Sequence, residues 1–332
     1  MLSYLVRRVL IMIPTLIAIS AIVFVIIQLP PGDYLSTMMA ELQAQGESAS
    51  LDKLQFLREQ YGLDRPPIEQ YLHWVLGLLR GDLGWSFEYN LPVSQLIGER
   101  LLLSIILAVT TVLFTYLVAF PIGIYSATHQ YSAGDYALTF LGFIGLATPS
   151  FLLALVLLYV ANVWFGTSIG GLVDPSYLGK PMSWGKFLSV LEHLWIPVLV
   201  IGLSGTAAMI RRLRANLLDE LQKQYVVTAR AKGMPPGRLL MKYPLRMALN
   251  PFIADIGSIL PQLISGAAIV SVVLSLPTNG PMLLRALQSQ DMYLAGSFLM
   301  IEAVLVVVGV FLSDIALAAL DPRIRLEGKR RA

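Results

Sequence analysis

The 332-residue sequence contains no cysteine and little charge. Without cysteine, disulfides, thiolate metal sites, iron–sulfur clusters and cysteine nucleophiles are all excluded. Charged residues make up 14% of the chain, whereas an ordinary soluble protein has about 25%. Hydrophobic residues make up 56%, and the mean hydropathy is +0.69. This composition excludes a secreted domain, a disordered chain and a cytosolic enzyme, and it is typical of a polytopic membrane protein.

Motifs for catalysis or cofactor binding are missing as well. No G-x-x-x-x-G-K-[ST] sequence occurs, so a P-loop cannot hold ATP in this chain. The three histidines, His73, His129 and His193, are scattered and do not indicate a metal site. We therefore expect no enzyme site, cofactor or metal in this chain, and any ATP and Mg that drive it would bind to separate ATPase subunits.

Long uncharged stretches predict membrane helices. A span requires about 20 apolar residues, and four gaps between charged residues each have room for one. We predict six spans, the first of which is an uncleaved anchor because its apolar core is longer than that of a signal peptide. They cover Val9–Leu29, Leu101–Ala127, Ala137–Phe165, Leu194–Ile210, Phe252–Leu276 and Ala295–Leu320.

The distribution of basic residues predicts the orientation. An even number of spans places both termini on one side, together with the 128–136 turn and the 211–250 loop. That side carries 16 Lys and Arg residues, against 8 on the other, so it should be cytoplasmic. The predicted divisions are 1–30, the N-terminus and first helix; 31–100, an extracytoplasmic loop; 101–320, a five-helix core; and 321–332, a cytoplasmic tail.

The predicted extracytoplasmic loop contains two helical patterns. Leu51, Leu54, Leu57 and Tyr61 have helical spacing, and Gly62 should end that helix. A second helix is expected over 68–76, with Tyr71 and Trp74 at headgroup depth.

The 211–250 loop has nine basic and two acidic residues and is longer than a passive connection needs. A helix is predicted from Ala215 to Lys232, with Asp219 and Glu220 near its start and Arg230 and Lys232 at its end. Gly233 should adopt a left-handed C-cap, and Pro235-Pro236 should prevent continuation. A second helical stretch over 238–249 should break at Pro244. One face of the first helix is apolar and contains Leu217, Leu218, Leu221, Tyr225, Thr228 and Ala229.

This apolar face has two interpretations on physical grounds alone. A basic amphipathic segment can rest on anionic lipid, or it can insert into the groove of a partner protein. Neither interpretation is favoured by the residues themselves.

Residues 225–233, Tyr-Val-Val-Thr-Ala-Arg-Ala-Lys-Gly, resemble the "EAA" loop of binding-protein-dependent ABC importer permeases, most closely the oligopeptide/dipeptide/nickel branch. Val227-Thr228 stands where the general pattern has Glu-Ala. The segment 274–280 also departs from a family segment that is usually richer in Phe, Trp and Gly. Further matches run through the chain, at Tyr4-Leu5-Val6-Arg7-Arg8, Ile13-Pro14-Thr15, Pro31-Gly32-Asp33, 61–66, Gln70-Tyr71, 79–86, Pro149-Ser150-Phe151 and 321–325.

The resemblance implies an all-α permease of the type I ABC importer fold, with six transmembrane helices, in the bacterial inner membrane. It also implies a second, paralogous permease, two cytoplasmic ATPase subunits and an extracytoplasmic solute-binding protein. Peptides are the favoured substrates, with oligosaccharides, opines and nickel as alternatives. The implied ATPase-coupling residues are Leu221, Tyr225, Thr228 and Ala229 as the docking face, Arg230, Ala231 and Lys232 as its rim, and Gly233 as the bend.

Acidic residues within the predicted spans leave a rival class open. Glu302, Asp255 and Asp314 could relay protons in a self-sufficient secondary transporter, but structural pairing is favoured because no basic partner is evident inside the membrane. Prolines that could kink spans two to five stand at Pro121, Pro149, Pro197 and Pro261.

Overall fold

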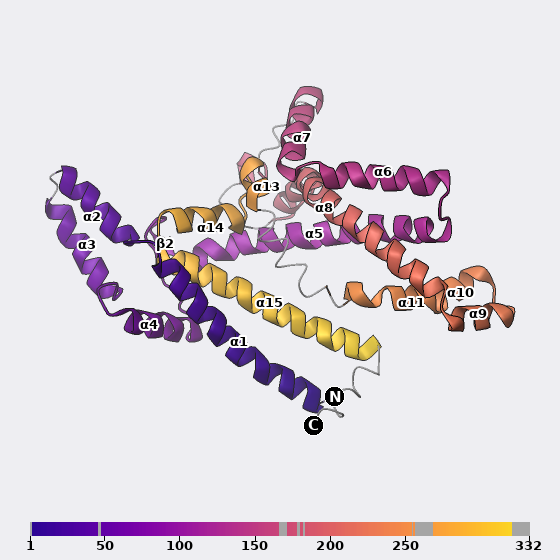
Figure 1. The fold of residues 1–332 in the computed structure, drawn as a ribbon. Helices are drawn as coiled ribbons and strands as arrows, with labels where there is room; N and C mark the ends of the chain where they lie inside the picture. The colour runs from indigo at the N-terminus through magenta and orange to yellow at the C-terminus, as the bar shows by residue number, and fades with distance from the viewer. Residues whose placement is uncertain are drawn as a thin grey trace. The chain divides into compact units, whose positions relative to one another are not determined.

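The computed structural model describes residues 2–45, 48–165, 171–177, 180–181, 183–253, 255 and 268–320. Within these ranges the chain is helical apart from one two-stranded antiparallel ribbon, which confirms the all-α fold class (Figure 1). The chain divides into two compact units. Unit 1 comprises Met1–Leu102 and Thr278–Val308, and unit 2 comprises Leu103–Pro277 and Gly309–Ala332.

Four helices are long and apolar enough to cross a membrane, and they coincide with predicted spans one, two, four and six. They are α1 (Leu2–Gln28), α5 (Val93–Thr128), α8 (Trp184–Leu221) and α15 (Met292–Leu320). A bent pair, α6 (Ala133–Ala147) and α7 (Ser150–Phe165), is apolar enough to be a fifth, broken span or a re-entrant loop. The predicted span 252–276 lies mostly outside the described residues, so the count of six stays a prediction.

The third predicted span is not one helix, because α6 and α7 meet at 98°. Thr148 ends α6 in an extended conformation, with ψ 121°, as expected for a residue before proline. Pro149 therefore breaks its span, whereas Pro121 and Pro197 are accommodated inside α5 and α8. Pro261 lies outside the described residues.

Helix α8 is more than twice as long as the predicted span. It begins after Ser183, whose side chain accepts a hydrogen bond from the Lys186 amide, and it has 38 residues. At 1.5 Å per residue it is about 57 Å long, nearly twice the hydrocarbon thickness of about 30 Å. Part of α8 must therefore extend outside the membrane core.

Unit 1 contains the segment between the first two spans. Its short elements are α2 (Tyr34–Gln45), α3 (Ser48–Gln60), α4 (Pro67–Leu79), β1 (Trp85–Ser86), β2 (Leu91–Pro92) and α14 (Asn279–Gln288). Helices α3 and α4 were predicted, and Gly62 does adopt a positive φ of 67° after α3. The sequence analysis missed α2 and α14. Trp74 is 3% exposed and packs near Phe24 and Tyr71, so it lies inside the protein and not at an exposed interface.

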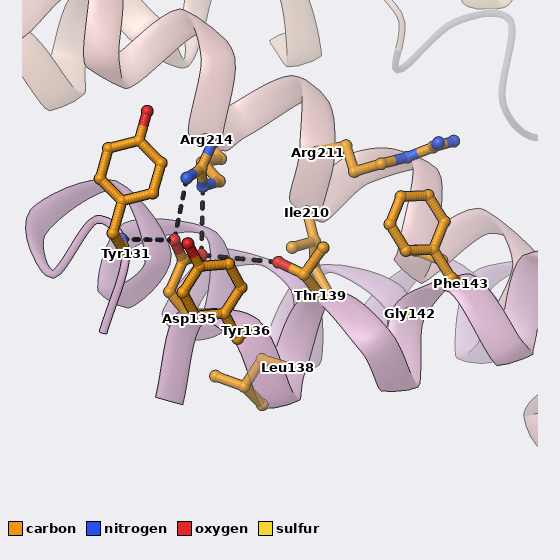
Figure 2. Close-up of a pocket in the computed structure, with 11 residues that line it drawn as sticks. Tyr131, Asp135, Tyr136, Leu138, Thr139, Gly142, Phe143, Ile210, Arg211 and Arg214 are labelled. Atoms are coloured by element: carbon orange, nitrogen blue, oxygen red, sulfur yellow. Dashed lines mark hydrogen bonds and ion pairs between the residues drawn. The ribbon is translucent and has the colours of Figure 1, made fainter. Parts of the chain in front are cut away.

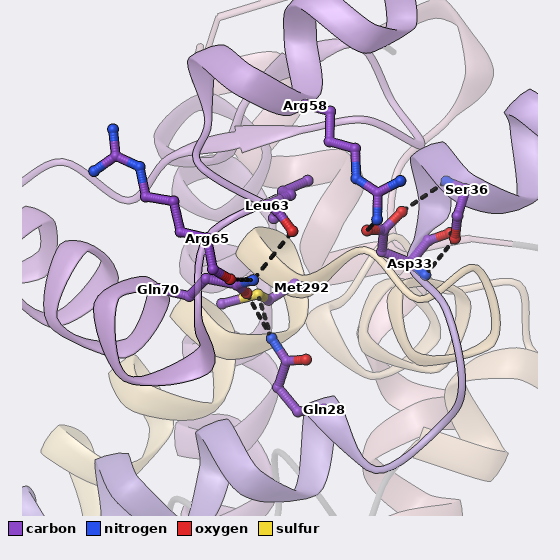
Figure 3. Close-up of polar contacts among 8 residues, drawn as sticks. All are labelled: Gln28, Asp33, Ser36, Arg58, Leu63, Arg65, Gln70 and Met292. Carbon is purple, nitrogen blue, oxygen red and sulfur yellow. Dashed lines mark hydrogen bonds and ion pairs between the residues drawn. The ribbon is translucent and has the colours of Figure 1, made fainter.

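Polar side chains join the end of α1 to the segments around α2, α3 and α4 (Figure 3). Gln70 donates hydrogen bonds to the carbonyl oxygens of Leu63 and Arg65, and it accepts one from Gln28 at 2.8 Å. Asp33 caps α2 through Ser36 and pairs with Arg58 at 3.3 Å. These contacts give a structural role to the Gly32-Asp33 and Gln70-Tyr71 sequences.

A second polar junction in unit 1 is centred on Asp291, which is fully buried. Its carboxylate accepts hydrogen bonds from the Ser86 hydroxyl at 2.7 Å and the Glu88 amide at 3.1 Å. It also caps α15 by accepting from the Leu294 amide at 3.2 Å. We refer to these four residues as the Asp291 junction. It connects the β1–β2 ribbon to the first turn of a membrane helix.

In unit 2 the largest apolar cluster surrounds α7 and α8 and includes α13 (Ala268–Val273). The short 3-10 helix η1 (Pro175–Tyr177) precedes α8. Asp174 accepts from the Ser176 amide, and hydrogen bonding by Ser176 lowers the pKa of Asp174.

Candidate functional site: the helices after α8

The predicted continuous helix from Ala215 to Lys232 is wrong. Helix α8 ends at Leu221, and a separate helix, α9, covers Gln224–Ala231. Lys223 between them is extended, with ψ 148°. Asp219 and Glu220 consequently lie in the last turn of α8, not at the start of a helix. The break lets α9 turn its own apolar side toward a different partner from that of α8.

The end of α9 agrees with the prediction. Gly233 has φ +78°. The Gly233 amide bonds to the Arg230 carbonyl at 3.0 Å, and the Met234 amide bonds to the Ala229 carbonyl at 3.3 Å. This pair of bonds is a Schellman motif, which needs a left-handed residue. A Cβ at Gly233 would meet nothing within 4 Å, so backbone conformation, and not space, makes glycine suitable here.

Helix α9 packs on the helix that follows it. Val226, Ala229 and Leu239 are buried together, with Met234 and Tyr243 packed against them. Leu239 belongs to α10 (Pro236–Lys242), and α11 (Pro244–Ala248) follows after a break at Tyr243. The expected interruption at Pro244 is therefore confirmed.

A second cluster attaches this segment to the membrane helices of unit 2. It joins residues of α5, α8 and α11, and Leu221 packs partly against it. The Phe120 ring lies edge-on to Phe252, with the ring centroids 5.7 Å apart. The buried members are Ala127, Leu213, Leu217, Leu245, Ala248 and Phe252. The α9–α11 segment is thus packed against α5 and α8 through this cluster.

The predicted coupling residues divide between two sides of α9. Ala229 is 8% exposed and faces Leu239, and Leu221 is half-buried on α8. The other six are exposed: Tyr225, Thr228, Arg230, Ala231, Lys232 and Gly233. Val227, 50% exposed, shares this outer surface and was missed because the sequence analysis extended the register of α8 through the break.

Tyr225 bridges that break by donating a hydrogen bond to the Glu220 carboxylate. Partial burial and this bond to Glu220 raise the pKa of Tyr225. The outer surface of α9 therefore presents a neutral phenol and apolar Val227 beside the cations Arg230 and Lys232.

Two ion pairs lie near the same end of α8. Structural pairing was the favoured interpretation of Asp255, and the structure agrees, because Asp255 forms an ion pair with Arg212. Asp135, which the sequence analysis did not select, is 3% exposed and accepts two bonds from Arg214, at 3.1 and 2.8 Å. Both pairs are structural contacts, and neither forms a chain of titratable groups through the membrane. Among the residues that the structure describes, no three His, Asp or Glu side chains cluster as a metal site would require.

Comparison with known proteins agrees with this architecture. Residues 119–326 match the family model "Binding-protein-dependent transport system inner membrane component", and residues 1–108 match the model of its N-terminal part. The oligopeptide transport system permease protein AppB of Bacillus subtilis is 35% identical, with 98% of this chain and 99% of that protein covered.

Two further relatives show the same near-complete coverage. The dipeptide transport system permease protein DppB of Escherichia coli K12 is 29% identical, and the di/tripeptide permease protein DppB of Pseudomonas aeruginosa is 30% identical. In both cases the match covers 98% of this chain and 99% of the relative. Together with the family models, which span both ends of the chain, these matches exclude the self-sufficient secondary transporter. The chain belongs to the binding-protein-dependent transport system inner membrane components, the permease subunits of ABC importers.

Proposed function

We propose that this chain forms, with a paralogous second permease, the membrane path of an importer for peptides. A solute-binding protein outside the membrane delivers the peptide, and two ATPase subunits in the cytoplasm supply the energy. The support is that each relative described above is named as an oligopeptide, dipeptide or di/tripeptide permease and is matched over nearly its whole length. Oligosaccharides, opines and nickel are the alternative substrates.

The observation that carries the coupling role is the two-sided structure of α9. Its inner side is held by Val226 and Ala229 on Leu239. Its outer side, with Tyr225, Val227 and Thr228, is left exposed. We propose that this outer side docks in a groove of an ATPase subunit, with Arg230 and Lys232 at the rim of the contact. The ATPase subunits, which bind ATP and Mg, would displace α9 when they close.

The packing of α9 on α10, and of α11 on α8 and α5, explains how such a displacement would reach the translocation path. Helix α9 moves with α10 because they share a core, and α11 packs with α8 and the end of α5. A push on α9 therefore tilts the ends of two membrane helices. This scheme places both termini and the 211–250 segment in the cytoplasm, residues 31–100 outside, and 101–320 as the permease core.

Cysteine crosslinking tests the docking surface directly, because the chain has no cysteine of its own. Thr228→Cys should crosslink to an ATPase subunit in the assembled importer, with a yield that changes when ATP is bound. Val226→Cys is the matched control, since Val226 is fully buried two residues away, and it should not crosslink. Equal yields from both positions, or none from Thr228→Cys in a fully assembled importer, would contradict the proposed surface.

The substrate and partners require a separate experiment. Purification of the tagged chain in mild detergent should retain a second permease and ATPase subunits, identified by mass spectrometry. The binding protein of the same system should then bind di- or oligopeptides. If the partners are retained but the binding protein binds an oligosaccharide or nickel, the importer assignment stands and the peptide substrate is rejected. A chain that retains no partner and transports under an ion gradient alone would reject both.

A further inference from the structure

A groove lies between α6 and α8 at the end of α8 where Arg211 and Arg214 stand (Figure 2). Its volume is about 330 Å³, within the size range of ligand sites. The floor is mainly apolar and is lined by Leu138, Gly142, Phe143, Ala207 and Ile210. The rim is polar and carries Tyr131, Tyr136, Thr139 and the two arginines.

The two arginines differ in what they contact. Arg214 reaches Asp135, so its charge is neutralised by a buried carboxylate. Arg211 lies one helical turn earlier, is exposed, and extends over the Phe143 ring with its guanidinium carbon 5.6 Å from the ring centre (Figure 2). No ion pair of Arg211 occurs among the described residues. Within the part of the chain that the structure describes, the groove therefore carries one positive charge without an ion pair, beside an apolar floor.

The location of the groove in the bilayer follows from the helices that form it. Helix α8 is long and apolar enough to span a membrane, and α6 is half of the bent apolar pair. The arginines mark the end of α8 that the positive-inside rule places in the cytoplasm. The cytoplasmic leaflet is rich in anionic lipids, and basic pockets between membrane helices on that side bind their headgroups. Tyr131 and Tyr136 are both largely exposed at the rim, where phenol hydroxyls meet headgroups.

We propose that this groove is a binding site for one anionic phospholipid of the cytoplasmic leaflet. Arg211 holds the phosphate, and the hydroxyls of Tyr131 and Tyr136 donate hydrogen bonds to the headgroup. The first part of an acyl chain lies along Gly142, Phe143 and Ile210. A soluble loop of a partner fits less well, because the apolar floor lies along helices that face the bilayer.

The site has a consequence for α9 that does not depend on the peptide substrate. Arg211 lies on the same helix as Leu213 and Leu217, which hold α11 in place. A bound lipid would therefore fix the end of α8 against α6 while the helices after it move. This gives the importer a dependence on anionic lipid that acts outside the translocation path.

The test uses the complete importer, with its partner subunits, in bilayers that contain phosphatidylethanolamine and a minor share of phosphatidylglycerol. Native mass spectrometry measures the lipid retained by each complex. Wild-type complexes should be enriched in phosphatidylglycerol, and Arg211→Gln should lower the retained amount about fivefold, the contribution of one basic residue near a membrane surface. Arg238→Gln, an exposed cation of α10 outside the groove, should retain as much as wild type.

A second variant fills the groove and leaves every charge in place. A Cβ at Gly142 meets only Ala207, at 3.8 Å, so Gly142→Leu should fold and should lose phosphatidylglycerol although Arg211 is intact. Equal retention by wild type and both groove variants would overturn the proposal. So would equal retention of the neutral lipid, because the headgroup would then not be recognised.

The occupant can also be identified in place. A photoreactive benzoylphenylalanine at Tyr136 in the assembled importer should form an adduct with phospholipid. An adduct with the second permease or an ATPase subunit would show that the groove is a protein interface, and this would reject the lipid site. Neither lipid readout requires transport, so failure here leaves the proposed peptide importer untouched, and the reverse also holds.

Discussion

The Asp291 junction in unit 1 and the α9–α11 segment in unit 2 are held together in opposite ways. In the junction, one buried carboxylate accepts bonds from Ser86 and Glu88, more than 200 positions away, and from its neighbour Leu294. In α9–α11, apolar contacts join residues such as Val226 and Leu239 and pack α11 on α5 and α8. The first arrangement depends on directed hydrogen bonds to one carboxylate, whereas the second depends on apolar packing.

This difference suits the two regions to different tasks. A buried polar group is costly whenever a partner is lost, so the junction resists partial opening and fixes the ribbon on α15. Apolar contacts are not directional, so a helix held by them can shift without losing a specific bond. The α9–α11 segment can therefore shift on the membrane helices, as the proposed docking of an ATPase subunit requires.

Removal of the Asp291 carboxylate should have the largest effect on stability. Asp291→Ala leaves the buried Ser86 hydroxyl and Leu294 amide without their acceptor, and each costs about 1–3 kcal/mol, so we expect a loss of roughly 2 kcal/mol or more. The melting temperature of the purified importer should fall, and residues 31–100 should become sensitive to protease. Asp64→Ala, at an exposed position of the same unit, should change neither. An unaltered melting temperature for Asp291→Ala would show that hydrogen bonds to this carboxylate do not hold the junction together, and the difference between the two regions would be refuted.

Gly233 should be the most sensitive position of α9–α11, through conformation and not through contacts. A left-handed backbone costs a residue with a Cβ about 1–2 kcal/mol, so Gly233→Ala should distort the end of α9 and lower peptide-stimulated ATPase activity and uptake. A β-branched residue, as in Gly233→Val, should uncouple transport while the chain still inserts. Asparagine should be tolerated better, since it adopts this conformation more readily.

Gly237→Ala provides the matched control for Gly233→Ala. A Cβ at Gly237 also meets nothing within 4 Å, but its φ is not positive. Alanine in the helix α10 should be neutral or slightly stabilising. Normal uptake by Gly233→Val, in an importer that requires this subunit, would remove the argument for a bend at this position.

The pH dependence of stability should reveal Asp291 as well. Burial raises the pKa of Asp291, so the folded chain binds this proton more tightly than the unfolded chain does. The part of the free energy of unfolding that comes from binding this proton is therefore fully present below the ordinary aspartate pKa of about 3.9. It is lost as the pH rises through the higher pKa of the folded chain. The hydrogen bonds to the carboxylate are a separate contribution. The melting temperature of wild type minus that of Asp291→Asn should decline across this interval. A difference that rises with pH would reverse the assigned direction.

The smallest effect is expected at Tyr225. Tyr225→Phe removes only the exposed hydrogen bond to Glu220 and keeps the ring, so the loss of stability should be about 0.5–1 kcal/mol. Uptake should remain near the wild-type level if the ring, and not the hydroxyl, contacts the ATPase. Tyr225→Ala should then lower uptake clearly more than Tyr225→Phe, as measured in the same transport assay. Equal uptake by the two variants would remove Tyr225 from the docking surface.

Local signals were enough to predict several details of the site. The left-handed conformation of Gly233, the break at Pro244 and the helix that ends before Gly62 are each set by one glycine or proline. These residues act through their own backbone torsions, so neighbouring segments do not alter the outcome. The division of the α8–α9 stretch was not predictable in this way, because no glycine or proline stands at Gln222–Lys223.

Which side chains of the site are buried could not be predicted from the sequence either. Ala229 and Val227 are both small and apolar, yet one is 8% exposed and the other 50%. Their difference depends on where α10 returns along α9. In the same way, Asp135 and Arg214 are 79 positions apart, so periodicity could not pair them, although each is a conspicuous charge at the end of an apolar stretch.

The sequence by itself determined that the chain is an all-α membrane protein, where four of its membrane helices run, and which glycine ends α9. These properties arise from the transfer of apolar residues out of water and from local backbone torsions, and both depend only on residues that are close together in the sequence. Only the tertiary structure decided which side of α9 is exposed, that Asp255 pairs with Arg212, and that Arg211 lies over Phe143 in a groove between α6 and α8. Those properties depend on contacts between distant segments, which hydropathy and spacing do not encode.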